Sequence, residues 1–135
     1  MKENPSVFPT GNPLPEQFSK YFIGQAYLQP LTDKGGPIAN VTFEAGCRNN
    51  WHIHHAKSGG GQILLVTGGK GWYQEWGKAA RELHPGDVVV IPAGVKHWHG
   101  AAADSDFSHL AVEVNGEEVS NEWLEAVTDE EYSIL

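Results

Sequence analysis

The stretch GDVVVIPAGVKH (residues 86–97) holds an apolar strand and the two turns that bound it. Residues 88–91 are a short run of β-branched side chains, which is typical of a strand. The PAG segment that follows predicts a tight corner, because proline restricts φ and glycine tolerates a positive φ. A second strand, VKHWHGA (95–101), is predicted directly after this corner and carries two histidines.

The same pattern of short strands and Gly or Pro turns extends in both directions from this stretch. It predicts strands over residues 21–28, 38–46, 51–55, 62–69, 71–76, 81–87, 88–94, 95–101 and 107–114. Strands this short, with turns every eight to twelve residues or so, indicate an all-β sandwich or barrel.

Both ends of the chain depart from the strand pattern. Residues 1–20 are rich in proline and predict an irregular arm, with one helical turn over residues 15–18. Residues 119–132 predict a helical segment: NEWLEAV (121–127) begins with a candidate N-cap, and TDEEY (128–132) resembles a capped turn. The barrel itself is expected over residues 21–115, within a single domain of residues 1–135.

Composition narrows the classes of function. The chain has 135 residues, one cysteine, nine Lys and Arg, and a net charge of −8. One cysteine excludes an intrachain disulfide, and the scattered cations argue against nucleic acid or an anionic membrane as a partner. The first residues lack a signal-peptide pattern, and no apolar run approaches the ~20 residues of a membrane span, so a cytoplasmic location is expected.

Histidines at strand positions are the strongest indication of chemistry. His52 and His54 in NWHIHH (50–55) are two residues apart, so a strand would project both to one face. A second His-x-His pair, His97 and His99, and the mid-strand His109 would meet them inside a closed barrel. Burying several imidazoles without a shared ion is unfavourable, which favours a metal site. His55, in contrast, is expected at the surface.

Two segments resemble the sequence motifs of the cupin family. GCRNNWHIH (46–54), followed by Gln62 and Gly68, is similar to the first cupin motif, and GDVVVIPAGVKH (86–97) matches the second. The resemblance implies a double-stranded β-helix, or jelly-roll, barrel. Cupins usually carry a glutamate after His-x-His, whereas the candidate here is Gln62. The site would therefore hold one negative charge fewer, and a bound ion would be a stronger Lewis acid towards an anion.

A wider likeness, over about residues 38–132, is to small bacterial cupins that include manganese-dependent hydroxynitrile lyases. It is carried by WHIH, GQILLVTGGKGW, HPGDVVVIPAGVKHWHGAA and SHLAV. It implies one divalent ion, manganese in preference to Fe, Ni, Co or Zn, held by four residues: His52, His54, Gln62 and His97. The resemblance also implies that His109 is an essential residue that does not bind the metal, and His99 matches the relatives too. The loop over residues 55–61 is longer than in those relatives.

The implied activity is a lyase acting on a small carbonyl adduct, with His109 or His99 as the general base. From its position alone, His109 could equally be a core histidine with a satisfied hydrogen bond. Two alternatives stay open: a metal-dependent dioxygenase or oxidative decarboxylase, and a small-molecule-binding cupin without activity. Glu113, on the His109 face, would make the pocket more acidic. A homodimer or homotetramer is expected, because the outward apolar residues Ile63, Leu65 and Trp98 need cover.

Overall fold

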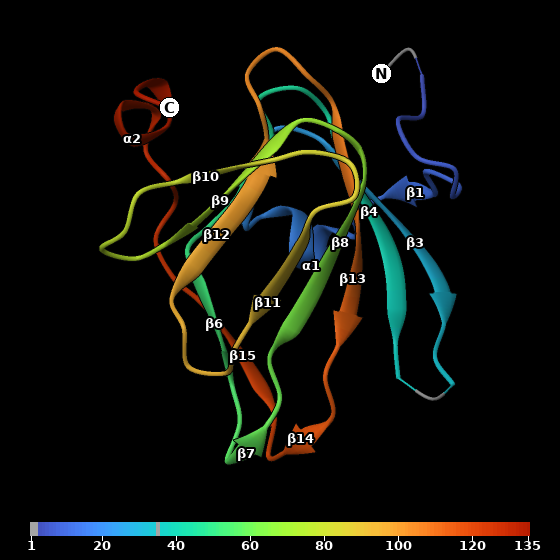
Figure 1. Cartoon of the computed structure of the whole chain (residues 1–135), viewed down its shortest axis with the longest axis vertical. Helices are drawn as coiled ribbons and strands as arrows, with labels where there is room; N and C mark the ends of the chain where they lie inside the picture. The colour runs from blue at the N-terminus through green and yellow to red at the C-terminus, as the bar shows by residue number, and fades with distance from the viewer. Residues whose placement is uncertain (1–2, 35) are drawn as a thin grey trace.

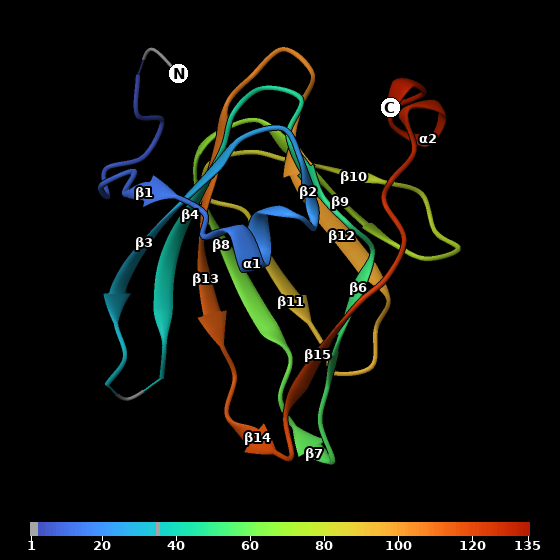
Figure 2. The ribbon, with the colours of Figure 1, turned by 180° about the vertical axis from the view of Figure 1, so that it is seen from behind.

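Two antiparallel sheets form the walls of a barrel in the computed structural model, which describes residues 3–34 and 36–135 (Figures 1 and 2). The first sheet has the strand order β1 (Asn12–Pro13), β3 (Ala26–Thr32), β4 (Ile38–Phe43), β13 (Phe107–Glu113), β8 (Gln62–Gly69) and β11 (Val88–Ile91). The second has the order β10 (Arg81–Leu83), β9 (Gly71–Glu75), β12 (His97–Ala101), β5 (Arg48–Asn49) and β2 (Phe22–Ile23).

Further short elements complete the barrel. In the second sheet, β6 (His52–His55) pairs with β12 and with β15 (Ser120–Trp123). A ribbon of β7 (Ser58–Gly59) and β14 (Gly116–Glu117) lies at one end of the barrel (Figure 1). The helices are α1 (Glu16–Ser19) and α2 (Asp129–Ser133), and within the described residues no helix has the length and apolarity to cross a membrane. The expected all-β class with a short C-terminal helix is confirmed.

The expected strand over residues 21–28 is in fact two strands in different sheets. The chain turns at Gly24, so that β2 joins the second sheet and β3 joins the first. Gly24 has a φ of +91°, and a Cβ at this position would lie 2.9 Å from the Cβ of Cys47. Only glycine satisfies both conditions. The residues on both sides of Gly24 favour a strand, so the sequence pattern does not reveal the turn between them.

The expected helix over residues 121–127 is wrong. Residues 120–123 form β15, whose Asn121 lies opposite His54 and whose Trp123 lies opposite His52 in the ladder with β6. Pairing with the exposed edge of β6 outweighs the weak helical preference of this stretch. The helix begins only after Thr128, which forms a capping box with Glu131.

The N-terminal arm, described from residue 3 on, covers part of the outer face of the first sheet. Ser6 Oγ donates to Asn40 Oδ1 over 3.2 Å, and Asn40 Nδ2 donates to the Pro9 carbonyl over 3.3 Å. The helical turn expected at residues 15–18 is present as α1. The arm is thus irregular, as expected, but it is attached to the sheet by polar contacts and by β1.

The PAG corner of the opening stretch has a direct link to the histidine strand. Gly94 has a φ of +87°, and its N–H donates to the His54 carbonyl over 2.8 Å. Apolar side chains that include Phe43, Leu64 and Phe107 form the main core of the barrel. Full burial of such side chains stabilises the fold by roughly 1.5–3 kcal/mol each.

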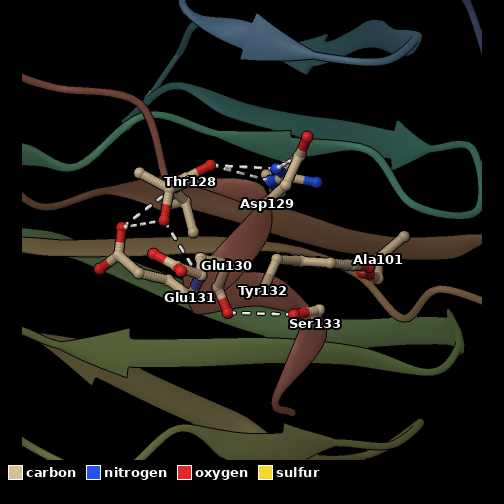
Figure 3. A network of polar contacts seen from close by, with 9 residues as sticks. Ala101, Thr128, Asp129, Glu130, Glu131, Tyr132 and Ser133 are labelled. Atoms are coloured by element: carbon tan, nitrogen blue, oxygen red, sulfur yellow. Dashed lines mark hydrogen bonds and ion pairs between the residues drawn. The ribbon is translucent and has the colours of Figure 1, made fainter.

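The C-terminal segment covers the outer face of the second sheet, away from the N-terminal arm (Figure 1). There Trp51 and Trp98 pack with Val127 in a second buried cluster, so Trp98 is fully covered by its own chain rather than left for a partner. Arg48 anchors this segment: its Nε and Nη2 donate to the Val127 carbonyl over 3.2 and 3.0 Å. Figure 3 shows the capped helix α2, from which the Tyr132 hydroxyl donates to the Ala101 carbonyl.

Replacing Arg48 with methionine is expected to lower the free energy of unfolding by roughly 1–3 kcal/mol, because the Val127 carbonyl loses its buried donors. Urea denaturation monitored by tryptophan fluorescence measures this loss. Asp129→Asn is the control. The Asp129 side chain is 98% exposed although it pairs with Arg48 over 2.6 Å. Its loss is expected to be below about 1 kcal/mol. Equal losses in the two variants would contradict this account of the anchor.

The outer face of the first sheet has apolar side chains that its own chain leaves partly open. Val88 and Val90 on β11 are 51% and 65% exposed, and they lie opposite Leu65 and Ile63 of β8. We propose that a second copy of the chain covers this face. Of the three residues expected to need cover, Ile63 and Leu65 still support a dimer, whereas Trp98 does not.

If the wild type sediments as a dimer, the Val88→Lys, Val90→Lys double variant is expected to sediment as a monomer. Equal sedimentation coefficients would contradict the proposal.

Candidate metal centre

Three histidines from two strands converge inside the barrel. His52 and His54 project from β6 to the same side, and His97 of β12 is the direct ladder partner of His52. Each ring offers a nitrogen, and these three atoms lie within 4.8 Å of one another. All three side chains are buried. The sequence-predicted pair and His97 are therefore brought together as a triad.

Each ring of the triad is held by an oxygen atom at Nδ1. His52 Nδ1 donates to the Asn50 carbonyl over 2.8 Å, and His97 Nδ1 donates to the Val95 carbonyl over 2.9 Å. His54 Nδ1 donates to Asn121 Oδ1 over 2.7 Å. Because a carbonyl oxygen only accepts, these bonds place the proton on Nδ1 and leave the Nε2 lone pair free.

The free nitrogens fit a metal ion. His54 Nε2 and His97 Nε2 are buried and have no hydrogen-bond partner in the described part of the chain. A buried ring nitrogen without a partner is unfavourable. Two such nitrogens close together are satisfied most simply by one metal ion that both bind. Orientation of ligating histidines by oxygen acceptors at the other ring nitrogen is also the usual arrangement in metal sites.

The electrostatics of His52 and His97 favour neutral rings, the form that binds metals. Burial lowers the pKa of His97 to about 4. Burial, together with the neighbouring His97, lowers the pKa of His52 well below its usual range. Protons therefore do not compete for these nitrogens at neutral pH.

Gln62 and Glu113 come to the same site from the opposite sheet. They are direct ladder partners on β8 and β13, and Gln62 Nε2 donates to Glu113 Oε1 over 2.6 Å. Both line the cavity that His52 and His54 also line. Glu113, which sequence placed on the His109 face, is thus at the pocket.

His99 and His109 extend the cluster away from the triad. The His99 ring lies 5.7 Å from that of His52 and 4.8 Å from that of His109, measured between ring centroids. Burial lowers the pKa of both rings, that of His109 to about 4. Neither nitrogen of His109 has a hydrogen-bond partner of ordinary geometry among the described residues. This does not support a core histidine with a satisfied bond, and it leaves the ring free to meet a ligand.

The cavity has a volume of about 520 Å³ and an uneven chemical character. Its lining combines four histidines, Gln62 and Glu113 with apolar side chains that include Leu14, Phe18, Phe22, Leu28, Val41 and Trp123. Within the described lining, the charged residues are the acids Asp33 and Glu113, and no Lys or Arg is among them. The cavity can therefore take a neutral molecule with an apolar part, and its described lining offers no Lys or Arg side chain to pair with a carboxylate.

Two residues of the site were not identified from sequence. Asn121 orients His54, and the Trp123 ring lies 4.6 Å from that of His52 and stacks on Tyr21. Both belong to the stretch assigned to a helix. Their spacing of two residues was the available signal, because an extended chain places such residues on one face. His55 is exposed and bonds Glu122, as its surface assignment predicted.

Stability of the metal-free protein is expected to fall as pH drops from 6.5 towards 4. Burial holds the pKa of folded His109 at about 4, so only the unfolded chain takes up a proton in this window. The His109 contribution that is lost by pH 5 amounts to roughly 2 kcal/mol. In urea denaturation of chelator-treated protein, the free energy of unfolding of His109→Leu should depend less steeply on pH than that of the wild type. An identical pH dependence in the two proteins would refute this assignment.

Comparison with known proteins agrees with this geometry. Residues 39–119 match the family described as "Cupin domain". The chain is 44% identical over 116 residues to an "(R)-mandelonitrile lyase" of Granulicella tundricola, with 83% of this chain and 86% of the relative covered. A cupin-like protein from Thermotoga maritima shares 40% identity and a TM-score of 0.80 over 96% of each chain. A cupin-2 domain protein from Rhodospirillum rubrum, 20% identical with a TM-score of 0.67, covers 98% of this chain and 86% of its own and supports the fold. The chain belongs to the cupin family and is a small cupin that resembles the hydroxynitrile lyases.

Proposed function

We propose that the chain is a metal-dependent lyase that splits a cyanohydrin into an aldehyde or ketone and hydrogen cyanide. The observation that carries the proposal is the position of His109. Its two unpartnered ring nitrogens are buried in the lining of the cavity that His52 and His54 of the triad also line. The 44% identity to a protein named as a mandelonitrile lyase supports the same reaction class.

In this proposal, Gln62 joins the triad as the fourth ligand of one divalent ion. The mixed nitrogen and oxygen donors suit Mn, Fe, Co, Ni or Zn, and manganese is preferred on the family resemblance. When bound, the ion supplies a Lewis acid that stabilises the negative charge of the developing cyanide. The triad is the part of the ligand set that the geometry already brings together.

The neutral imidazole of His109 accepts the hydroxyl proton of the substrate. The O–H electron pair then forms the C=O bond, the bond between the carbinol and nitrile carbons breaks, and its electrons leave with cyanide. The proton passes from the imidazole to cyanide, which restores the neutral ring. Burial favours this uncharged form between turnovers. His99, 4.8 Å from His109 between ring centroids, is the second candidate for the base.

The cavity favours a neutral substrate with an apolar group. Phe18, Phe22 and Trp123 provide aromatic surface in the same lining as the histidines, which suits an aryl group. The described lining contributes no Lys or Arg, and its acids would repel an anion. This favours a cyanohydrin over the keto acids of the redox alternatives, whose carboxylates a Lys or Arg side chain would bind.

The decisive test is cleavage of mandelonitrile by protein loaded with manganese, followed by benzaldehyde absorbance and cyanide release. His52→Ala is expected to lose both the metal and the activity. His109→Ala should retain stoichiometric metal by elemental analysis while its rate falls by roughly 10²–10⁴-fold, the contribution of a general base.

His55→Ala is the matched control, since His55 adjoins the triad in sequence but is exposed and bonds Glu122. It should keep both metal and activity. Metal-loaded protein that consumes oxygen with a catechol or a keto acid, and releases no cyanide, would reject the lyase in favour of the redox enzyme. A retained ligand without turnover would favour a binding protein.

A further inference from the structure

We infer that Glu113 is a positioning residue that fixes the amide of Gln62 with its oxygen towards the histidine triad. The inference rests on the metal centre proposed above, in which Gln62 is a ligand. The two residues face each other directly across the β8 and β13 ladder. Gln62 Nε2 donates to Glu113 Oε1 over 2.6 Å, which is shorter than is usual for an N–H···O bond.

The chemistry of the two groups allows only one orientation of the amide. An amide has a carbonyl end that accepts and an NH₂ end that donates, whereas a carboxylate only accepts. The NH₂ end must therefore face Glu113, which leaves the carbonyl oxygen on the other side. A rotation of the amide by 180° would break the bond to Glu113 and turn N–H groups towards the ion. Divalent cations bind the amide oxygen and repel such donors.

Glu113 thus does for Gln62 what three other oxygen acceptors do for the histidines. Asn50, Val95 and Asn121 supply the oxygen atoms that orient the rings of His52, His97 and His54, respectively. Glu113 supplies the oxygen that orients the fourth proposed ligand. Every group of the proposed set is then held in its metal-binding orientation before an ion arrives.

The charge of Glu113 adds to this effect. Among the described residues, the ligating atoms of the three histidines lie within 4.8 Å of one another. The Glu113 carboxylate is not part of this group. It therefore acts through the Gln62 amide, whose carbonyl oxygen becomes a better donor when its NH₂ group bonds a carboxylate. The ligand set keeps a formal charge of zero, while one negative charge lies just behind it.

The experiment compares Mn²⁺ affinity of metal-free wild type, Glu113→Leu and Glu113→Gln by isothermal titration calorimetry. Glu113→Leu removes the acceptor, so Mn²⁺ affinity should fall by roughly 10–100-fold. Glu113→Gln keeps a side-chain oxygen that can accept from Gln62, so it should recover most of the lost affinity. Glu82→Leu, at an exposed carboxylate on β10, is the matched control and should bind Mn²⁺ like the wild type.

The visible absorption of bound Co²⁺ gives a second readout of the ligand set. The spectrum should change in Glu113→Leu and match the wild type in Glu113→Gln. Thermal unfolding of each metal-free variant checks that it folds, and Glu113→Ala replaces the leucine variant if that variant does not.

The outcomes separate this inference from the proposed function. Wild-type protein that binds no divalent ion would reject the metal centre and the inference together. If Gln62→Leu weakens Mn²⁺ binding but Glu113→Leu does not, Gln62 is a ligand and the positioning role of Glu113 is overturned. Equal losses in Glu113→Leu and Glu113→Gln would also overturn it, because charge rather than amide orientation would then determine the affinity.

Discussion

The architecture of this site depends on the burial of imidazole nitrogens that have no protein partner. His54 Nε2 and His97 Nε2 are enclosed by the barrel, and their Nδ1 atoms are already occupied by oxygen acceptors. A buried nitrogen without a partner destabilises the fold unless a ligand satisfies it. At this place an ion can bind the nitrogens and remove the penalty. Apolar side chains that include Phe43, Leu64 and Phe107 form the main core of the barrel.

The register of strand pairing brings histidines that are far apart in sequence into one site. His97 lies opposite His52, and Asn121 lies opposite His54, so each triad contact follows from strand pairing in the second sheet. The first sheet repeats the principle with Gln62 opposite Glu113. A shift of one residue in either pairing would turn these side chains outwards. The position of the site therefore depends on backbone hydrogen bonds far more than on the flexibility of its side chains.

The C-terminal segment links the stability of the barrel to the site. Its β15 strand supplies Asn121 and Trp123 to the cavity, and the residues that follow cover Trp98 on the outer face. Arg48 fastens this segment through the Val127 carbonyl. One stretch of chain thus orients a metal-binding histidine, forms an aromatic wall of the pocket and closes a second apolar cluster. Its anchoring is expected to affect both folding and ligand access.

The sequence by itself determined the barrel class and most of the histidine site. Period-two placement of His52 with His54, and the turn residues around Gly94, depend on local backbone geometry that a short segment carries with it. Only the tertiary structure decided the break at Gly24, the strand at residues 120–123 and the contact between Gln62 and Glu113. These depend on a distant partner: Cys47 approaches Gly24, the edge of β6 recruits β15, and β13 aligns with β8. Local preference is weak beside such pairings, because the hydrogen bonds of a sheet form between segments far apart in sequence.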